Sequence, residues 1–176
     1  MPNNNNRKAY NNKSKTIPQG ISFKAISSFN QEEMAFLCQL YITTRWDEVM
    51  QAPWNDTQRK DFLTKQFDSQ HIHYQSHYPN ATYLLIQKDK KNIGRIYLDR
   101  GNTSLCLIDI ALMPDYKNKG LGTILLKELI KEAQSTNKKI VIHVENFNPA
   151  YYWYLKYGFK QIEDKGVYQY MEWHPV

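Results

Sequence analysis

The chain has 176 residues, 41% of them hydrophobic, and a formal net charge of +6, so its length fits one domain with a substantial core. No apolar run approaches a membrane span or a signal peptide, and we expect a soluble, cytoplasmic protein without a membrane partner. Four of the six excess positive charges lie in residues 1–20, which leaves +2 for residues 21–176 and little support for nucleic-acid binding.

The N-terminal segment differs in composition from the rest of the chain. Residues 1–19 are rich in Asn and Lys with almost no apolar side chains, and we expect them to be disordered. Residues 20–176 then form a single domain. The two cysteines, Cys38 and Cys106, lie among apolar residues and suit reduced core thiols better than a disulfide.

The first half of the domain is predicted as one short strand, at residues 21–26, and two helices. Each helix opens on a capping box, in which an asparagine, Asn30 or Asn55, is followed three residues later by Glu or Gln. Apolar residues at helical spacing continue each pattern. We expect the first helix to bend at residues 43–46, and the second to run to about Tyr78.

The second helix carries His73 and His77, which are spaced like two metal ligands on one helical face. No Glu or Cys lies nearby at a matching offset to complete a metal site. A solvated or cleft-lining face is therefore the better interpretation, and we predict no metal.

Three strands follow in a row, at residues 82–87, 93–99 and 105–113, with loops short enough for hairpins. The third strand is apolar on both faces except for Asp109, its only charge. A charge in a buried strand is costly unless it faces a cleft or a partner. Asp109 is therefore a candidate site residue.

A glycine-containing loop joins the third strand to an apolar helical repeat. Its residues are Lys117, Asn118, Lys119, Gly120, Leu121, Gly122 and Thr123. The first amides of a helix lack internal partners and lie at the positive end of its dipole, which makes such a loop a potential anion site. A simple tight turn explains the spacing equally well. The pattern fits neither a P-loop nor the three-glycine dinucleotide fingerprint.

The C-terminal part begins with a predicted strand at residues 139–145, in which His143 and Glu145 share one face. Asn148 before Pro149 is typical of a helix start, with the proline at the first helical position. The helix is short and aromatic, and Gly158 suits the left-handed position after its end. A hairpin with strands at residues 159–163 and 167–173 closes the chain.

This ordered set resembles the GNAT superfamily of acyl-CoA-dependent N-acetyltransferases. The motifs that carry the resemblance are Lys117-x-x-Gly120-x-Gly122, Asn148-Pro149-Ala150 and Tyr154-Leu155-Lys156-Tyr157-Gly158-Phe159. It covers residues 82–173 by motif and residues 21–78 by element order. Lys117 departs from the usual Gln or Arg. The resemblance implies an α/β (α+β) GNAT fold, with a mixed, mostly antiparallel sheet of about six or seven strands, about four helices, and splayed fourth and fifth strands.

The resemblance also implies acetyl-CoA as co-substrate. Backbone of the third predicted strand of the row, at Ile110, Ala111, Leu112 and Met113, would pair with pantetheine, and Lys117, Asn118, Lys119, Gly120, Leu121, Gly122 and Thr123 would hold the pyrophosphate. Asn148 and Tyr154 would contact the cofactor arm, although Asn148 is equally well explained as a helix cap.

The implied mechanism is direct attack of a neutral amine on the thioester, without a covalent enzyme intermediate. Tyr154 would give its proton to the departing thiolate, and the alternative is a purely packing role among the other aromatic residues. Candidates for the base or amine-binding group are Asp109, then Glu145, then His143. A water chain to solvent could replace all three.

The expected acceptor is a primary amine, and the acidic residues favour a small cationic molecule over a protein N-terminus or lysine. The helices of residues 31–78, with Trp46 and Trp54, and the terminal hairpin would wall its pocket. A non-catalytic acyl-CoA-binding regulatory module is the alternative from another class. Homodimers are common in the resembling family.

Overall fold

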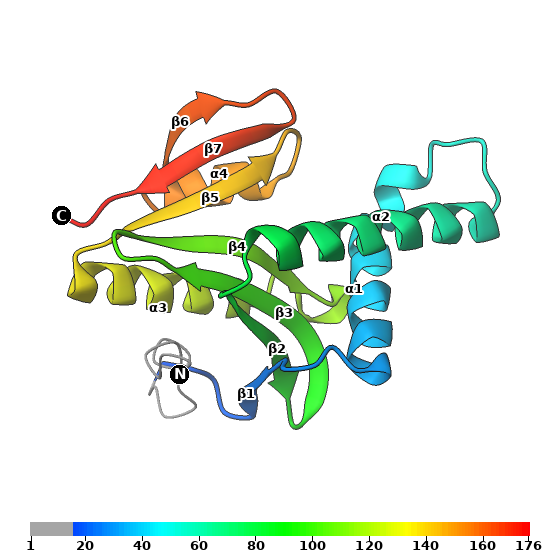
Figure 1. Cartoon of the computed structure of the whole chain (residues 1–176), viewed down its shortest axis with the longest axis horizontal. Coiled ribbons are helices and arrows are strands. Elements are labelled where there is room, and N and C mark those ends of the chain that lie inside the picture. The colour runs from blue at the N-terminus through cyan, green and yellow to red at the C-terminus, as the bar shows by residue number, and fades with distance from the viewer. Residues whose placement is uncertain (1–15) are drawn as a thin grey trace.

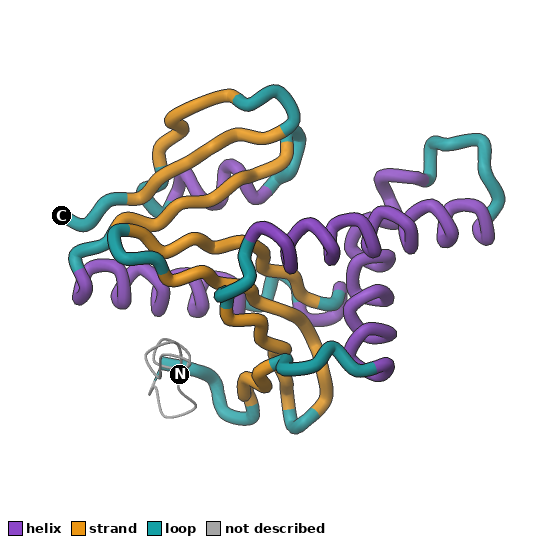
Figure 2. Tube along the Cα trace, in the orientation of Figure 1, coloured by secondary structure: helices purple, strands orange, loops and turns teal. Residues whose placement is uncertain are grey.

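The computed structural model describes residues 16–176, so most of the segment predicted to be disordered, residues 1–15 of residues 1–19, lies outside it. Its elements are shown in Figures 1 and 2. They are β1 (Ile21–Ala25), α1 (Gln31–Val49), α2 (Asp56–His77), β2 (Thr82–Lys88), β3 (Lys91–Arg100), β4 (Ser104–Leu112), the 3-10 turn η2 (Pro114–Tyr116), α3 (Leu121–Thr136), β5 (Lys139–Glu145), α4 (Ala150–Lys156), β6 (Lys160–Asp164) and β7 (Tyr168–Trp173).

The seven strands form one sheet in the order β1-β2-β3-β4-β5-β7-β6. Every neighbouring pair is antiparallel except β4 and β5, which are parallel because α3 crosses between them. The mixed, mostly antiparallel sheet expected from the sequence is confirmed.

Helices cover both faces of this sheet (Figure 1). One buried cluster joins α1 and α2 to residues such as Tyr83, Leu85 and Tyr97. The other joins α3 and α4 to residues such as Ile96 and Ile142. The sheet thus separates an α1/α2 face from an α3/α4 face.

Both predicted capping boxes are present, at Asn30 and at Asn55. The expected bend at residues 43–46 is wrong, because α1 continues as one helix to Val49. No glycine or proline lies between Gly20 and Pro53, and helices kink sharply mainly at such residues.

The expected splay between β4 and β5 is confirmed. Residues Ser104 to Cys106 of β4 pair with Lys139 to Val141 of β5, and the two strands share no further ladder pairs. Beyond that point they diverge and leave a V-shaped gap, which opens toward Leu112 and Glu145 at their carboxyl ends.

A β-bulge changes which face the residues of β4 occupy. Tyr97 of β3 pairs with Asp109, and the next residue of β3 pairs with Leu107, so Ile108 drops out of the register. Leu107 before the bulge and Ile110 after it both pack on the α3 side. Asp109 consequently turns toward α1 and α2.

Candidate functional site

The open end of the V is spanned by α1. Near the end of β4, Thr43 Oγ1 lies 3.8 Å from the Met113 sulfur. At the end of β5, Arg45 binds Glu145. A single turn of one helix therefore contacts both arms of the gap.

The Arg45–Glu145 pair is bidentate. Nη1 donates to Oε2 at 2.8 Å and Nη2 donates to Oε1 at 2.7 Å. The two side chains are 20% and 31% exposed, so solvent still reaches the pair. Burial acts to lower the pKa of Arg45, but its hydrogen bond to Glu145 and the nearby negative charges raise that pKa above its ordinary value.

Asp109 faces a buried partner instead of an open cleft. Its Oδ2 accepts a hydrogen bond from Arg95 Nη2 at 2.7 Å and another from the Tyr74 hydroxyl at 3.2 Å. The same Arg95 nitrogen donates to Gln70 Oε1 at 2.8 Å, and Arg95 is only 4% exposed. Two strands and α2 thus hold the Asp109 carboxylate in place.

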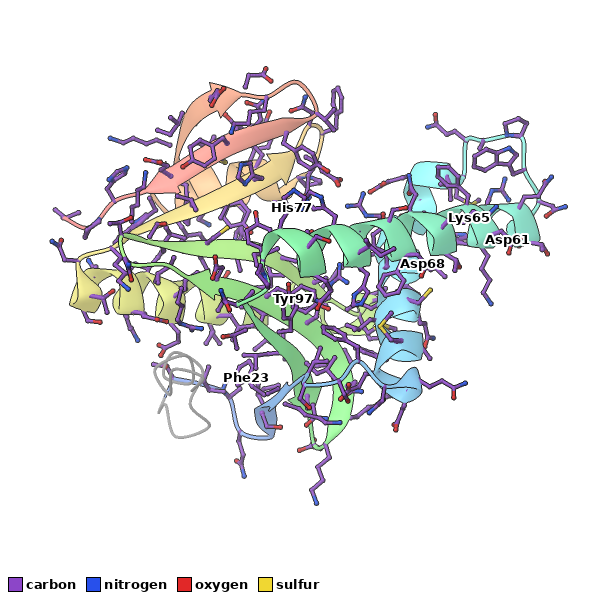
Figure 3. The ribbon with its side chains drawn as sticks, viewed as in Figure 1. Phe23, Asp61, Lys65, Asp68, His77 and Tyr97 are labelled. Carbon is purple, nitrogen blue, oxygen red and sulfur yellow. The ribbon has the colours of Figure 1, made fainter. Side chains whose placement is uncertain are left out.

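Tyr97, labelled in Figure 3, lies between β3 and α2. The Arg95 guanidinium is 5.0 Å from the centroid of its ring. Burial raises the pKa of Tyr97 to about 12, and the negative charge of Asp109 also raises it. The interior around Asp109 is therefore apolar enough to make a lone charge expensive.

Tyr154 lies on the opposite face of the sheet from the Arg95–Asp109 pair. Its ring packs against Trp153 and Phe159 at centroid distances of 4.8 and 5.2 Å. Burial raises the pKa of its phenol well above the ordinary value, and the charge of Asp109 raises it further. The phenol therefore keeps its proton at neutral pH.

His143 is the third charged or titratable candidate on the α1/α2 face. Its ring lies 5.0 Å from that of Tyr170, and the residue is exposed. Partial burial lowers its pKa below the ordinary 6.5, and the charge of Lys165 lowers it further. The imidazole is therefore neutral at pH 7.

Of the predicted pantetheine-binding residues, Ile110 to Leu112 lie on the diverging arm of β4 and Met113 directly follows it. Their edge toward β3 is hydrogen-bonded, whereas the β4–β5 ladder ends at Cys106. Within the described residues, this stretch therefore leaves its β5-facing backbone edge outside any ladder.

The glycine loop contains two residues with left-handed backbone. Asn118 and Gly120 have φ angles of 57° and 85°, and α3 begins directly afterwards without a side-chain cap or an acidic residue in its first turn. A small cavity of about 130 Å³ adjoins the loop and is lined by Lys119 and Lys88, among others. The same segment of chain also contains the remaining predicted loop residues, which are Lys117, Leu121, Gly122 and Thr123.

Asn148 lies one residue ahead of the cap position of α4 and not at that position as predicted. Its Oδ1 accepts a hydrogen bond from the Ala150 amide at 2.9 Å. The helix begins at Ala150 and not at Pro149 as predicted, since Pro149 is the flanking cap residue, although its own backbone is already helical. A cavity of about 540 Å³ lies beside this turn, lined by Asn148, Glu145 and Gln169, among others.

Two other sequence features take no part in this arrangement. His73 and His77 stack at 3.9 Å near the end of α2, where Figure 3 labels His77. Residues 16–176 hold no group of three or more His, Cys, Asp or Glu side chains placed to bind a metal. Trp54 packs against Phe62 of α2, with ring centroids 4.9 Å apart, and the loop between α1 and α2 lies at the outer end of α2 (Figure 1).

Sequence reasoning missed Arg45, Arg95 and Lys88. Arg45 meets Glu145 across 100 positions of sequence, and Arg95 meets Asp109 across a hairpin whose register depends on the bulge. The only sequence signal for either ion pair was the charge of Asp109 in an apolar strand, which indicated that Asp109 needs a partner or a cleft. Among the helices of residues 16–176, none is long and apolar enough to cross a membrane.

Comparison with known proteins adds the following. Residues 45–159 match the profile of the Acetyltransferase (GNAT) family. No curated protein matches the chain. The PaiA N-acetyltransferase of Thermoplasma acidophilum, solved in complex with coenzyme A, is 21% identical, with a TM-score of 0.62 over 88% of this chain and 98% of that one.

Two more solved structures share the fold. An acetyltransferase of Streptococcus agalactiae is 17% identical, with a TM-score of 0.60 over 89% of this chain and 99% of that one. A GNAT family acetyltransferase of Elizabethkingia anophelis, solved with acetyl-CoA bound, is also 17% identical, with a TM-score of 0.53 over the same shares. At these identities the likeness concerns the fold.

Proposed function

The chain belongs to the GNAT acetyltransferase family, and from this premise we propose that it is an N-acetyltransferase that moves the acetyl group of acetyl-CoA to a primary amine. The observation that carries the proposal is the gap between β4 and β5, with a proton-bearing phenol on one face and titratable groups on the other. This arrangement provides a donor side and an acceptor side for one reacting bond.

Acetyl-CoA is the proposed donor because the chain's own features fit its parts. The free edge of β4 at Ile110 to Met113 suits the amides of pantetheine, and the start of α3 suits the pyrophosphate. Lys119 and Lys88 add positive charge beside that loop. Solved relatives of the same fold hold coenzyme A or acetyl-CoA, which supports the assignment.

The proposed reaction forms one bond and breaks one. The amine nitrogen attacks the thioester carbon, the new C–N bond forms, and the C–S bond breaks. Acetyl-CoA and an alkylammonium ion give the acetamide, free coenzyme A thiol and one released proton. Tyr154 protonates the sulfur. The nitrogen loses one proton before the attack and a second one after it, and this second proton restores the Tyr154 phenol.

The ion pairs reverse the order of the base candidates. Asp109 and Glu145 are each bound to an arginine, whereas His143 is neutral at pH 7 and lies on the same face of β5 as Glu145. We therefore assign to His143 the proton that the amine loses before it attacks.

The rate should fall as the pH drops through the lowered pKa of His143, below 6.5, and His143→Gln should remove that acidic limb from the pH profile of kcat/KM. An unchanged limb would assign the proton to water.

Two measurements test the donor and the reaction separately. Acetyl-CoA should raise the melting temperature, and adenosine or NAD should not. An absence of any shift at saturating acetyl-CoA contradicts the donor assignment. Release of free thiol in the presence of a panel of primary amines should then identify acceptors. Binding of acetyl-CoA without thiol release from any amine would favour the regulatory module.

A further inference from the structure

The Arg45–Glu145 pair occupies the acceptor side of the gap. Glu145 is the last residue of β5, and Arg45 lies on α1, the helix that spans the ends of both diverging strands. Glu145 also lines the cavity of about 540 Å³ beside α4. An acceptor whose nitrogen approaches the gap along the α1/α2 face meets this pair.

Charge balance restricts which acceptors can bind there. A molecule with only an ammonium group could take Glu145 from Arg45. The guanidinium, 20% exposed, would then keep Glu48 at 3.2 Å as its carboxylate partner, and Glu48 is 60% exposed and on the same helix. An exposed pair of this kind contributes little. A purely cationic acceptor therefore gives up a strong bidentate contact for a weaker one.

A zwitterion avoids this cost. Its carboxylate can take the place of Glu145 on Arg45, because the guanidinium presents two parallel donors that match any carboxylate. Its ammonium group can simultaneously bind the released Glu145. Both charges of the original pair remain satisfied after the exchange.

We propose that the acceptor is a free α-amino acid, whose carboxylate binds Arg45 and whose ammonium group binds Glu145. This inference rests on the proposed N-acetyltransferase function and specifies its substrate class. The product is the N-acetylamino acid, formed by the same exchange of C–S for C–N. Peptides with a free N-terminus lack the carboxylate next to the amine and are poor acceptors on this assignment.

The test compares three forms of one acceptor. The panel of free amino acids is screened first for thiol release from acetyl-CoA. The best acceptor is then compared with its primary amide and its decarboxylated amine. Wild-type kcat/KM should be ~10- to 100-fold higher for the amino acid, the range typical of a lost charge-assisted bidentate contact. Arg45→Gln should reduce this preference to about onefold through a loss on the amino acid alone.

The chain offers a matched control. Arg100 forms a similar bidentate pair with Glu132, with distances of 2.7 and 3.1 Å, on the α3 side of the sheet. Arg100→Gln should keep the preference for the carboxylate. If Arg45→Gln does not fold, Arg45→Lys keeps the charge, loses the bidentate contact and should show an intermediate preference.

The outcomes separate the two proposals. Thiol release with the amine or the amide as efficient as with the amino acid overturns the acceptor assignment and leaves the acetyltransferase function standing. A carboxylate preference that survives in Arg45→Gln also overturns it. If no amine of any kind causes thiol release, the proposed function itself is overturned, and the acceptor assignment with it.

Discussion

The negative charge of Asp109 raises the pKa of the Tyr154 phenol, although the two residues belong to opposite faces of the sheet. The Asp109 carboxylate contacts α2, and Tyr154 belongs to α4. The strands β4 and β5 diverge in the region between these two residues, so no continuous sheet separates the Asp109 carboxylate from the Tyr154 phenol there. The gap is therefore an electrostatic connection between the two faces as well as a space for substrate.

This relationship leads to a prediction for Tyr154→Phe. If the phenol protonates the departing thiolate, the variant should lower kcat by ~10²- to 10⁴-fold, the usual contribution of a general acid. The loss should be the same from pH 6 to pH 9, because the raised pKa keeps the phenol protonated throughout. Acetyl-CoA affinity, measured by calorimetry, should change little. Equal turnover would reassign Tyr154 to packing.

The second prediction concerns Asp109→Asn. The substitution leaves Arg95, 4% exposed, without its carboxylate, and breaking one partner of a buried ion pair costs about 3–5 kcal/mol of unfolding free energy. Urea unfolding measures this loss. The double variant Asp109→Asn with Arg95→Met should recover part of it. A stable but inactive Asp109→Asn protein would instead indicate that Asp109 takes part in the reaction.

Two glycines of the anion loop allow a paired test. Gly120 has a φ of +85°, where an alanine is strained by roughly 1–2 kcal/mol, so Gly120→Ala should lower the melting temperature. Gly122 has no such φ, and a Cβ there would meet Trp153 at an ordinary 3.8 Å. Gly122→Ala should therefore fold normally and bind acetyl-CoA more weakly. Unchanged affinity would remove the start of α3 from the pyrophosphate site.

The last prediction concerns acid stability. Burial acts to raise the pKa of Glu172, but hydrogen bonds from Lys139, Tyr170 and His174 lower it to about 2, against an ordinary value of 4.5. Because the folded pKa is the lower one, Glu172 stabilises the fold above pH 4.5, and this contribution disappears as the pH falls toward 2.

Glu172→Gln should accordingly have a lower melting temperature than wild type at pH 7, and the two curves should converge between pH 4.5 and pH 2. Circular dichroism at a series of pH values measures both curves. Parallel curves over the whole range would mean that the hydrogen bonds around Glu172 contribute no pH-dependent stability.

The elements themselves could be predicted because their signals are local. Capping boxes at Asn30 and Asn55, the apolar repeat from Leu121 and the glycine at Gly158 each act within a few residues. The loop and the aromatic helix could also be placed in order along the chain. That order led to the family resemblance and, through it, to the splayed strands.

The partners of the acidic residues could not be predicted, because they depend on tertiary contacts. Glu145 was a candidate base, and no local pattern around it indicates a contact with Arg45, which lies on a helix 100 positions earlier. Asp109 was correctly identified as needing a partner or a cleft, yet the choice of Arg95 depends on strand register. Of these two ion pairs, Arg45–Glu145 is the one on which we base the proposal of a zwitterionic acceptor in place of a simple cation.

The bulge at Ile108 is the one position where β4 can change in length without changing the faces of its later residues. Many apolar substitutions at Ile108 leave the face of every later residue unchanged. Deletion of Ile108 would close the bulge and restore regular alternation, so Asp109 would stay on the α1/α2 face and Ile110 and Leu112 would stay on the α3 face. Natural variation within this strand should therefore tolerate the loss of a residue at Ile108, whereas the loss of a residue elsewhere in β4 would turn every later side chain to the opposite face.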